Sequence, residues 1–169
     1  MPIDDLLSRA LDLAAVKGAS YCDVRLVETN QERFVVRNGV VDTISNDESL
    51  GVGVRVLVNG SWGFASTNIA TPAEVDRATG LAVEIAAASA QSSNGPVSLG
   101  PPVTSRGVYT TPIKIDPFSI SSEDKLGLLL EADQRMGSVK GISARMGNLI
   151  FIKEHKLSLI HISEPTRPY

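Results

Sequence analysis

The sequence has 169 residues, a formal net charge of −3 and an isoelectric point near 5.4. This length suffices for one compact domain, or for one small domain and part of a second. The nearly balanced charge argues against nucleic-acid binding through bulk positive charge, and the hydrophobic content of 43% excludes an intrinsically disordered chain. The single cysteine, Cys22, excludes a disulfide framework within the chain and fits a reducing compartment.

The sequence also predicts where the protein resides. Residues 1–5 are acidic and amphipathic, whereas a signal peptide begins with basic residues followed by an apolar run. The most apolar window, residues 81–90, is interrupted by Glu84 and falls far short of the roughly 20 residues that cross a bilayer. We therefore expect a cytoplasmic protein.

The N-terminal part of the chain predicts a helix followed by an antiparallel sheet. Residues 3–17 carry leucine and alanine at steps of three and four, and Gly18 follows them, which is typical of an amphipathic helix that ends at a glycine. Residues 20–67 then alternate valine with polar or small residues. Asn-Gly pairs that begin at Asn38 and Asn59 are strong hairpin signals. We expect a four- or five-stranded antiparallel meander over this range.

Two further helices are predicted. Thr71, Pro72 and Glu74 form a capping box with proline in the first turn, so a helix is expected to begin there. After a proline-rich stretch, Ser121 is expected to cap a third helix. The residues of 142–152 are typical of a strand.

These elements predict an α+β fold. It consists of a two-layer sandwich, in which flanking helices cover an antiparallel sheet of four to five strands, followed by an incomplete second α/β module. The expected divisions are an N-terminal domain (residues 1–95), a proline-rich linker (96–118), the truncated start of a second domain (119–157) and a non-native tail (158–169).

The glycines and the cysteine are the first candidates for chemistry. Gly51 and Gly53 resemble part of a nucleotide-binding glycine motif, but they precede a valine-rich strand rather than a helix whose N-terminus would meet phosphate. Glycines that admit a close neighbouring backbone or a bulge are favoured. Cys22 falls on the apolar phase of the first strand with no histidine nearby, so a small buried residue is favoured over a nucleophile.

The histidines and acidic residues form no recognisable metal or catalytic motif. His155 follows Glu154, and His161 lies six positions after His155, whereas a zinc-binding helix presents two ligands one turn apart. Paired carboxylates could act as general acid and base, but solvated or capping roles are favoured. The acidic candidates are Asp42, Asp47, Glu48, Asp116, Glu123 and Asp124.

Arginines and aromatic residues of the strands offer binding rather than catalysis. Arg25 and Arg55 fall on polar phases and could each hold a substrate carboxylate, although a surface ion pair is favoured. Trp62 and Phe64 alternate on the last strand of the meander and are assigned to the core rather than to a binding platform. We therefore identify no catalytic, cofactor-binding or metal-binding residue. The residues alone predict a binding or scaffolding module, or a fragment of an enzyme.

Two groups of motifs occur together within residues 3–157. The first comprises Tyr21-x-Asp23-Val24-Arg25, Arg37-Asn38-Gly39, Gly51-Val52-Gly53-Val54-Arg55-Val56, Gly63-Phe64-Ala65 and the helix after Thr71. The second comprises Tyr109-Thr110-Thr111-Pro112 and Asp116-Pro117-Phe118-x-x-Ser121-x-Glu123-Asp124-Lys125. With these motifs the chain resembles the N-terminal domain and the start of the middle domain of the TldD/PmbA family, the "modulator of DNA gyrase" peptidases. The second group is similar to the TldD branch.

This resemblance implies a zinc metallopeptidase that degrades or trims unfolded peptides in the cytoplasm, as a homo- or heterodimer of family subunits. The family's metal motif, His-Glu-x-x-x-His with a later cysteine, matches no stretch of this sequence, so no role is carried over to Cys22 or His155. We expect an N-terminal fragment of a TldD-type enzyme that is inactive alone, with zinc bound only in the full-length protein. The alternatives are a fragment of the non-catalytic PmbA-type partner, which binds peptides, and a free-standing peptide-binding module. None of these interpretations predicts that the protein binds nucleic acid directly or associates with a membrane.

Two further expectations concern a strand and the C-terminus. A sheet edge at Val54 and Val56 is expected to align an extended peptide through main-chain hydrogen bonds. Residues 158–169 depart from the family pattern and resemble the translation of sequencing-adapter DNA, so they are excluded from the expected fold.

Overall fold

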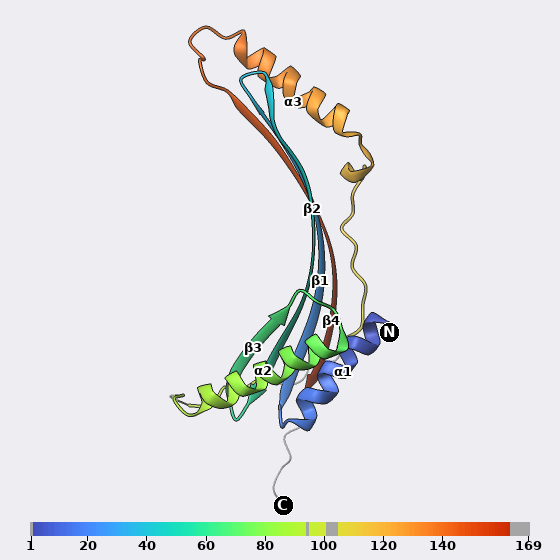
Figure 1. The fold of residues 1–169 in the computed structure, drawn as a ribbon, viewed down its shortest axis with the longest axis vertical. Helices are drawn as coiled ribbons and strands as arrows, with labels where there is room; N and C mark the ends of the chain where they lie inside the picture. The colour runs from blue at the N-terminus through green and yellow to red at the C-terminus, as the bar shows by residue number, and fades with distance from the viewer. Residues whose placement is uncertain (1, 94, 101–104, 163–169) are drawn as a thin grey trace, which may run out of the picture. The chain divides into compact units, whose positions relative to one another are not determined.

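A computed structural model describes residues 2–93, 95–100 and 105–162 of the chain. Its sheet has four antiparallel strands in the order β3-β2-β1-β4, with helices flanking it, and this confirms the predicted α+β class (Figure 1). The elements in chain order are α1 (Ile3–Val16), β1 (Tyr21–Arg37), β2 (Val40–Val58), β3 (Ser61–Thr67), α2 (Pro72–Ala90), the 3₁₀ turn η1 (Pro117–Ser119), α3 (Ser122–Gly137) and β4 (Met146–Ile162).

The strands are longer than predicted. Residues 20–67 form three strands rather than the expected four or five, because β1 and β2 continue for 17 and 19 residues through the polar stretches where breaks were expected. Polar side chains bond across these stretches, as where Asn30 Nδ2 donates to Glu48 Oε1 at 3.4 Å. The fourth strand, β4, comes from a distant part of the sequence and extends beyond the predicted 142–152.

Both Asn-Gly turns are confirmed. Asn38 and Gly39 have φ of 50° and 78°, and Asn59 and Gly60 have φ of 51° and 74°. Positive φ at both central residues is the signature of the tight hairpin turn whose twist matches that of the flanking strands. The second turn sets a β2–β3 register in which Arg55 lies opposite Phe64.

The chain divides into two compact units that share the long strands. Unit 1 comprises Met1–Glu28, Ser49–Ser105 and His155–Tyr169, and unit 2 comprises Thr29–Glu48 and Arg106–Glu154. The predicted domain boundaries stay predictions. Pro101 and Pro102 of the predicted linker lie outside the described residues, as do residues 163–169 of the predicted tail, whereas residues 158–162 belong to β4.

In unit 1, α1 and α2 cover one face of the sheet (Figure 1). Every second residue of each strand turns toward these helices, as the period of a strand requires. The fully buried side chains of this core include Leu7, Ala10, Val24, Val54, Val56, Val75, Ala78 and Ala82. Leu157 and Leu159 of β4 pack against the same core.

Helix α2 lies unusually close to β3. A Cβ atom on Gly63 would lie 2.0 Å from the Ala82 carbonyl oxygen and 2.6 Å from the Ala86 nitrogen. The alanines of α2 therefore bring the helix backbone against a strand position that only glycine can occupy.

The start of α2 differs from the predicted capping box. Thr71 is the N-cap residue and Pro72 follows it, but the Thr71 side chain makes no capping hydrogen bond. Glu74 instead forms an ion pair with Arg77, three residues further along the helix. Along α2, Ile85 is 38% exposed, whereas Thr79 is buried and its hydroxyl donates to the Val75 carbonyl.

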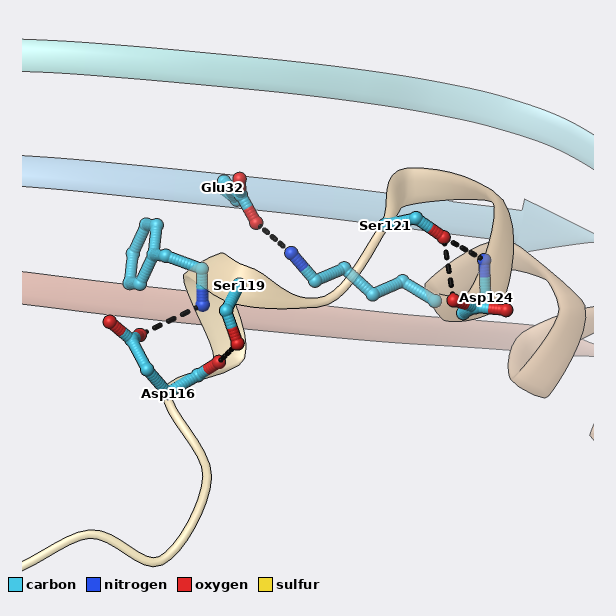
Figure 2. Close-up of polar contacts among 7 residues, drawn as sticks. Glu32, Asp116, Ser119, Ser121 and Asp124 are labelled. Atoms are coloured by element: carbon cyan, nitrogen blue, oxygen red, sulfur yellow. Dashed lines mark hydrogen bonds and ion pairs between the residues drawn. The ribbon is translucent and has the colours of Figure 1, made fainter.

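In unit 2, the predicted cap of α3 is confirmed. Figure 2 shows that the Ser121 hydroxyl accepts from the Asp124 backbone N–H and bonds the Asp124 carboxylate. Just before it, the Asp116 carboxylate accepts from the Phe118 N–H and its carbonyl accepts from the Ser119 hydroxyl. The backbone hydrogen bond lowers the pKa of Asp116. The motif from Asp116 to Lys125 is thus a run of caps that positions the first turn of α3.

Helix α3 buries two charged residues together with Leu129. Lys125 is 4% exposed and pairs with Glu32 of β1. Asp133 is 2% exposed and lies 3.1 Å from Arg145. Leu130, by contrast, is 37% exposed. The Lys125 ammonium also lies near the rings of Phe34, Phe118 and Phe151, at 5.4, 6.0 and 5.1 Å.

Replacement of Gly63 by alanine tests the close approach of α2 and β3. Because the new Cβ would overlap the α2 backbone, we expect Gly63→Ala to lower the free energy of unfolding by about 3 kcal/mol or more. Gly80→Ala is the matched control, because no described atom lies within 4 Å of its Cβ position, and it should stabilise the helix by up to about 1 kcal/mol. Urea unfolding measures both. Equal effects of the two substitutions would contradict the close approach.

Because the ion pair between Lys125 and Glu32 is buried, we expect substitutions of its two residues to have strongly non-additive effects on stability. Lys125→Met leaves the Glu32 carboxylate, whose side chain is only 17% exposed, without its ammonium partner, so we expect a loss of about 3 kcal/mol in urea unfolding. The double variant Glu32→Leu/Lys125→Met removes both charges and should recover most of that loss. A double variant no more stable than Lys125→Met would argue that the pair does not hold α3 to the sheet.

Candidate functional site

The face of unit 1 opposite α1 and α2 carries an open hollow of about 600 Å³. Val52, Val54 and Val56 of β2 turn toward the helices, so the residues between them turn toward this hollow. The residues that matter for its chemistry are Asp23, Arg25, Gly51, Gly53, Arg55 and Phe64.

A buried carboxylate organises one side of the hollow. The Asp23 side chain is only 4% exposed, and its Oδ2 accepts from Arg55 Nε at 2.7 Å and from the Tyr21 hydroxyl at 3.0 Å. Arg25 Nε lies 3.2 Å from Oδ1 of the same carboxylate. A buried carboxylate needs such partners, since an unpaired charge is costly away from water. Two guanidinium groups thus share one carboxylate.

Aromatic rings fix the position of Arg55. Its guanidinium lies 4.9 Å from the ring centre of Trp62 and 5.9 Å from that of Tyr21, and the two rings pack edge to face at 5.4 Å. Burial acts to lower the pKa of Arg55, but the hydrogen bonds to Asp23 and Tyr21 raise it above its ordinary value. Burial raises the pKa of Tyr21 despite its hydrogen bond to Arg55. Arg55 therefore stays charged and Tyr21 stays protonated at neutral pH.

Glycines of the central strand β2 form the floor of the hollow. No described atom lies within 4 Å of the Cβ position of Gly51, whereas a Cβ on Gly53 would lie 3.2 Å from the Phe64 ring. Phe64, on β3, is 58% exposed. The floor is therefore covered at Gly53 and open at Gly51.

Comparison with known proteins finds similarities in sequence and in fold. Residues 22–86 match the family model for the PmbA/TldA metallopeptidase domain 1. Over these residues the chain is similar to the first domain of that metallopeptidase family. A metalloprotease from Methanocaldococcus jannaschii, MJ0996, is 26% identical over 120 residues, which are 71% of this chain and 27% of that protein.

Solved structures share the fold. A candidate modulator of DNA gyrase from Bacteroides thetaiotaomicron superposes with a TM-score of 0.74 at 18% identity, over 93% of this chain and 36% of that one. A second from Thermotoga maritima gives 0.69 at 15% identity, over 96% and 36%. TldE from Thermococcus kodakarensis gives 0.61 at 15% identity, over 92% and 34%. The present chain thus spans about a third of the length of these TldD/PmbA-like structures.

The residues described here do not fit the zinc that a TldD/PmbA metallopeptidase implies. In the described part of the chain, no group of three or more His, Cys, Asp or Glu side chains is placed to hold a metal ion. Burial, with a contribution from Asp23, raises the pKa of the Cys22 thiol to about 12, so the thiolate that zinc or a nucleophile needs is not available at neutral pH. His155 is exposed and lies 3.6 Å from Glu28, and the side chain of His161 lies outside the described residues.

The other predicted candidates serve as ion pairs or caps. Asp42 lies 3.8 Å from Arg37, Glu48 accepts from Asn30, and Asp116 and Asp124 take part in the caps described above. Glu123 lies in the first turn of α3, where a negative charge is favourable, and Asp47 is an exposed residue of β2. The structure brings none of these candidates to the hollow.

The strand residues of the predicted binding set do meet at the hollow. Arg25 and Arg55 form the expected ion pairs, but both share the buried Asp23, which the sequence did not single out. Gly51 and Gly53 lie within a strand, as favoured. The assignment of Phe64 to the core is wrong, because β3 turns it to the face without helices, where it is largely exposed. Trp62 lies on the same face and stacks on Arg55.

The expectation of a peptide-aligning edge at Val54 and Val56 is also wrong. Strand β2 lies between β3 and β1 in the sheet, so its backbone bonds are taken on both sides. Both valine side chains are fully buried against the helices. The sheet's edges are instead β3 and β4.

None of the helices in the described part of the chain is long and apolar enough to cross a membrane.

Replacement of Asp23 tests the charge network. Asp23→Asn keeps the shape but leaves Arg25 and Arg55 without their shared negative charge, so we expect a loss of about 2 to 3 kcal/mol in urea unfolding. Arg25→Gln is the matched control, since it breaks one half-exposed ion pair and should cost at most about 1 kcal/mol. If Arg25→Gln proved as costly as Asp23→Asn, the carboxylate would not be the centre of the network.

Proposed function

We propose that this chain is the N-terminal part of a TldD-type zinc metallopeptidase that degrades or processes unfolded peptides. The observation that carries the proposal is the match of residues 22–86 to the first domain of a metallopeptidase family. The similarity to MJ0996, a metalloprotease, supports it. The second group of motifs, Asp116 to Lys125, supports the TldD branch through its resemblance.

In this proposal, residues beyond this sequence hold the zinc and carry out hydrolysis. The His, Cys, Asp and Glu side chains described here form no group suited to hold a metal ion. No hydrolytic step is therefore assigned to them. The chain itself contributes a peptide-binding wall. Its support is the hollow lined by Arg25, Arg55 and Phe64, a combination of charge and apolar surface that suits a polypeptide.

We further propose that the protein works in the cytoplasm and pairs with a second TldD/PmbA subunit to form a homo- or heterodimer. The single cysteine of the sequence, Cys22, is a buried thiol, and this fits a reducing compartment. The pairing follows from the family resemblance.

A fragment of the non-catalytic PmbA-type subunit is the second candidate. The hollow supports the PmbA-type candidate as much as the TldD-type one, because a peptide-binding lining serves a subunit that does not cleave the peptide. The two candidates differ only in whether the protein continues into a zinc-binding motif.

An activity assay tests whether this chain is catalytic by itself. The purified chain, supplied with zinc, should show no hydrolysis of an unfolded fluorogenic peptide and should retain no stoichiometric zinc after dialysis. Reproducible hydrolysis that a chelator abolishes would overturn the assignment of chemistry to residues beyond this sequence.

Sequencing of the genomic locus across codon 157 decides between the two candidates. A reading frame that continues into His-Glu-x-x-x-His supports the TldD-type enzyme. A continuing frame without that motif overturns it in favour of the PmbA-type subunit. An unbroken copy of residues 158–169 followed by a stop codon would overturn both, together with the interpretation of this tail as non-native.

A further inference from the structure

We propose that the hollow formed by Arg25, Arg55, Gly51 and Phe64 binds a carboxylate side chain of an extended peptide. The inference deepens the proposed function, on which it rests for the peptide nature of the ligand, by naming the class of peptide: acidic, with an apolar residue beside the acid.

The charge distribution of the hollow favours an anion. Two guanidinium groups share the single carboxylate of Asp23, which leaves an excess of one positive charge in a chain whose net charge is −3. The carboxylate is 4% exposed, whereas the side chains of Arg25 and Arg55 are 57% and 43% exposed. The negative charge thus lies beneath the positive ones, and solvent meets the cations first.

Arg25 retains the capacity to bind a second carboxylate. A guanidinium has five N–H donors in a planar fork that suits a carboxylate. Arg25 lies against Asp23 through Nε at 3.2 Å, while Arg55 approaches the same carboxylate at 2.6 and 2.7 Å and lies near the rings of Trp62 and Tyr21. Arg25 is therefore the adaptable cation of the hollow, and Arg55 is the fixed one.

The shape of the hollow admits a side chain. Its volume of about 600 Å³ falls within the range of ligand sites. The space above Gly51 is open, since no described atom lies within 4 Å of its Cβ position. Phe64 beside Gly53 forms an apolar wall, and Ser66 and Asn68 contribute polar groups to the lining.

Side chains, rather than the backbone at Gly53 and Arg55, are the groups of the hollow that can select a ligand. From Val52 to Val58, β2 is paired with β3 and has β1 as its other neighbour, so the backbone groups of Gly53 and Arg55 are engaged in the sheet. Selection must come from the side chains of the lining, which offer positive charge next to an aromatic surface. This pairing fits an acidic residue adjacent to an apolar one, rather than a uniformly apolar peptide.

Fluorescence anisotropy with the full chain tests the charge preference. The probes are two labelled eight-residue unfolded peptides that differ only at one central position, Leu-Glu in one and Leu-Gln in the other. We expect the Glu peptide to bind about fivefold more tightly than the Gln peptide, in proportion to one partly exposed ion pair. Arg25→Gln should abolish this preference. Arg77→Gln, which removes the same charge from α2, should retain it.

A second variant fills the hollow without changing its charge. Gly51→Val places a side chain into the open space above the floor and suits a strand, so the protein should melt at the same temperature or higher. Binding of both peptides should weaken by at least about tenfold. This variant keeps the test decisive even if a charge substitution disturbs the fold.

Several results would overturn the inference. Arg25→Gln could retain the preference for Glu, Arg77→Gln could lose it equally through bulk charge, or Gly51→Val could bind as tightly as the wild type. A change in sedimentation from dimer to monomer in these variants, without a change in peptide binding, would assign the hollow to a second copy of the chain and would also overturn it. Equal binding of the two peptides overturns the acidic preference alone, because the locus sequence and the activity assay judge the peptidase proposal separately.

Discussion

The register of β2 against its neighbours is the constraint on which unit 1 depends. Because a strand alternates its side chains between two faces, the tight turn at Asn59 and Gly60 decides which residues meet the helices. In this register the valines of β2 enter the core, while Gly51, Gly53 and Arg55 reach the opposite face. A slip of one residue would exchange the two sets, so core and hollow are specified together.

Local chemistry made much of the fold predictable. Helix α1, the two Asn-Gly turns and the Ser121 cap each depend on residues within a few positions of one another, and all three predictions are confirmed. The pairing of β4 with β1 could not be predicted, because it joins residues more than 100 positions apart. For the same reason the sequence did not reveal the burial of Lys125, whose partner Glu32 lies 93 positions away.

The candidate site was predictable in its parts but not in its assembly. The alternation of apolar and polar residues along the strands placed Arg25 and Arg55 on the polar side, and the sequence correctly favoured ion pairs for both. It could not show that both meet one buried Asp23, since this depends on β1 and β2 lying side by side in the sheet. Phe64 was misassigned because an aromatic residue in a short alternating strand usually faces the core, and here the glycine at position 63 takes that face to admit α2.

The position of Cys22 gives the molecule a built-in reporter of its own motions. It is the single thiol of the sequence, it is 1% exposed, and it belongs to the core that α1 and α2 cover. A thiol reagent can reach it only when those helices separate from the sheet or the chain unfolds. The rate of its alkylation in the unmodified protein therefore measures how often the helical layer opens, without any engineered probe.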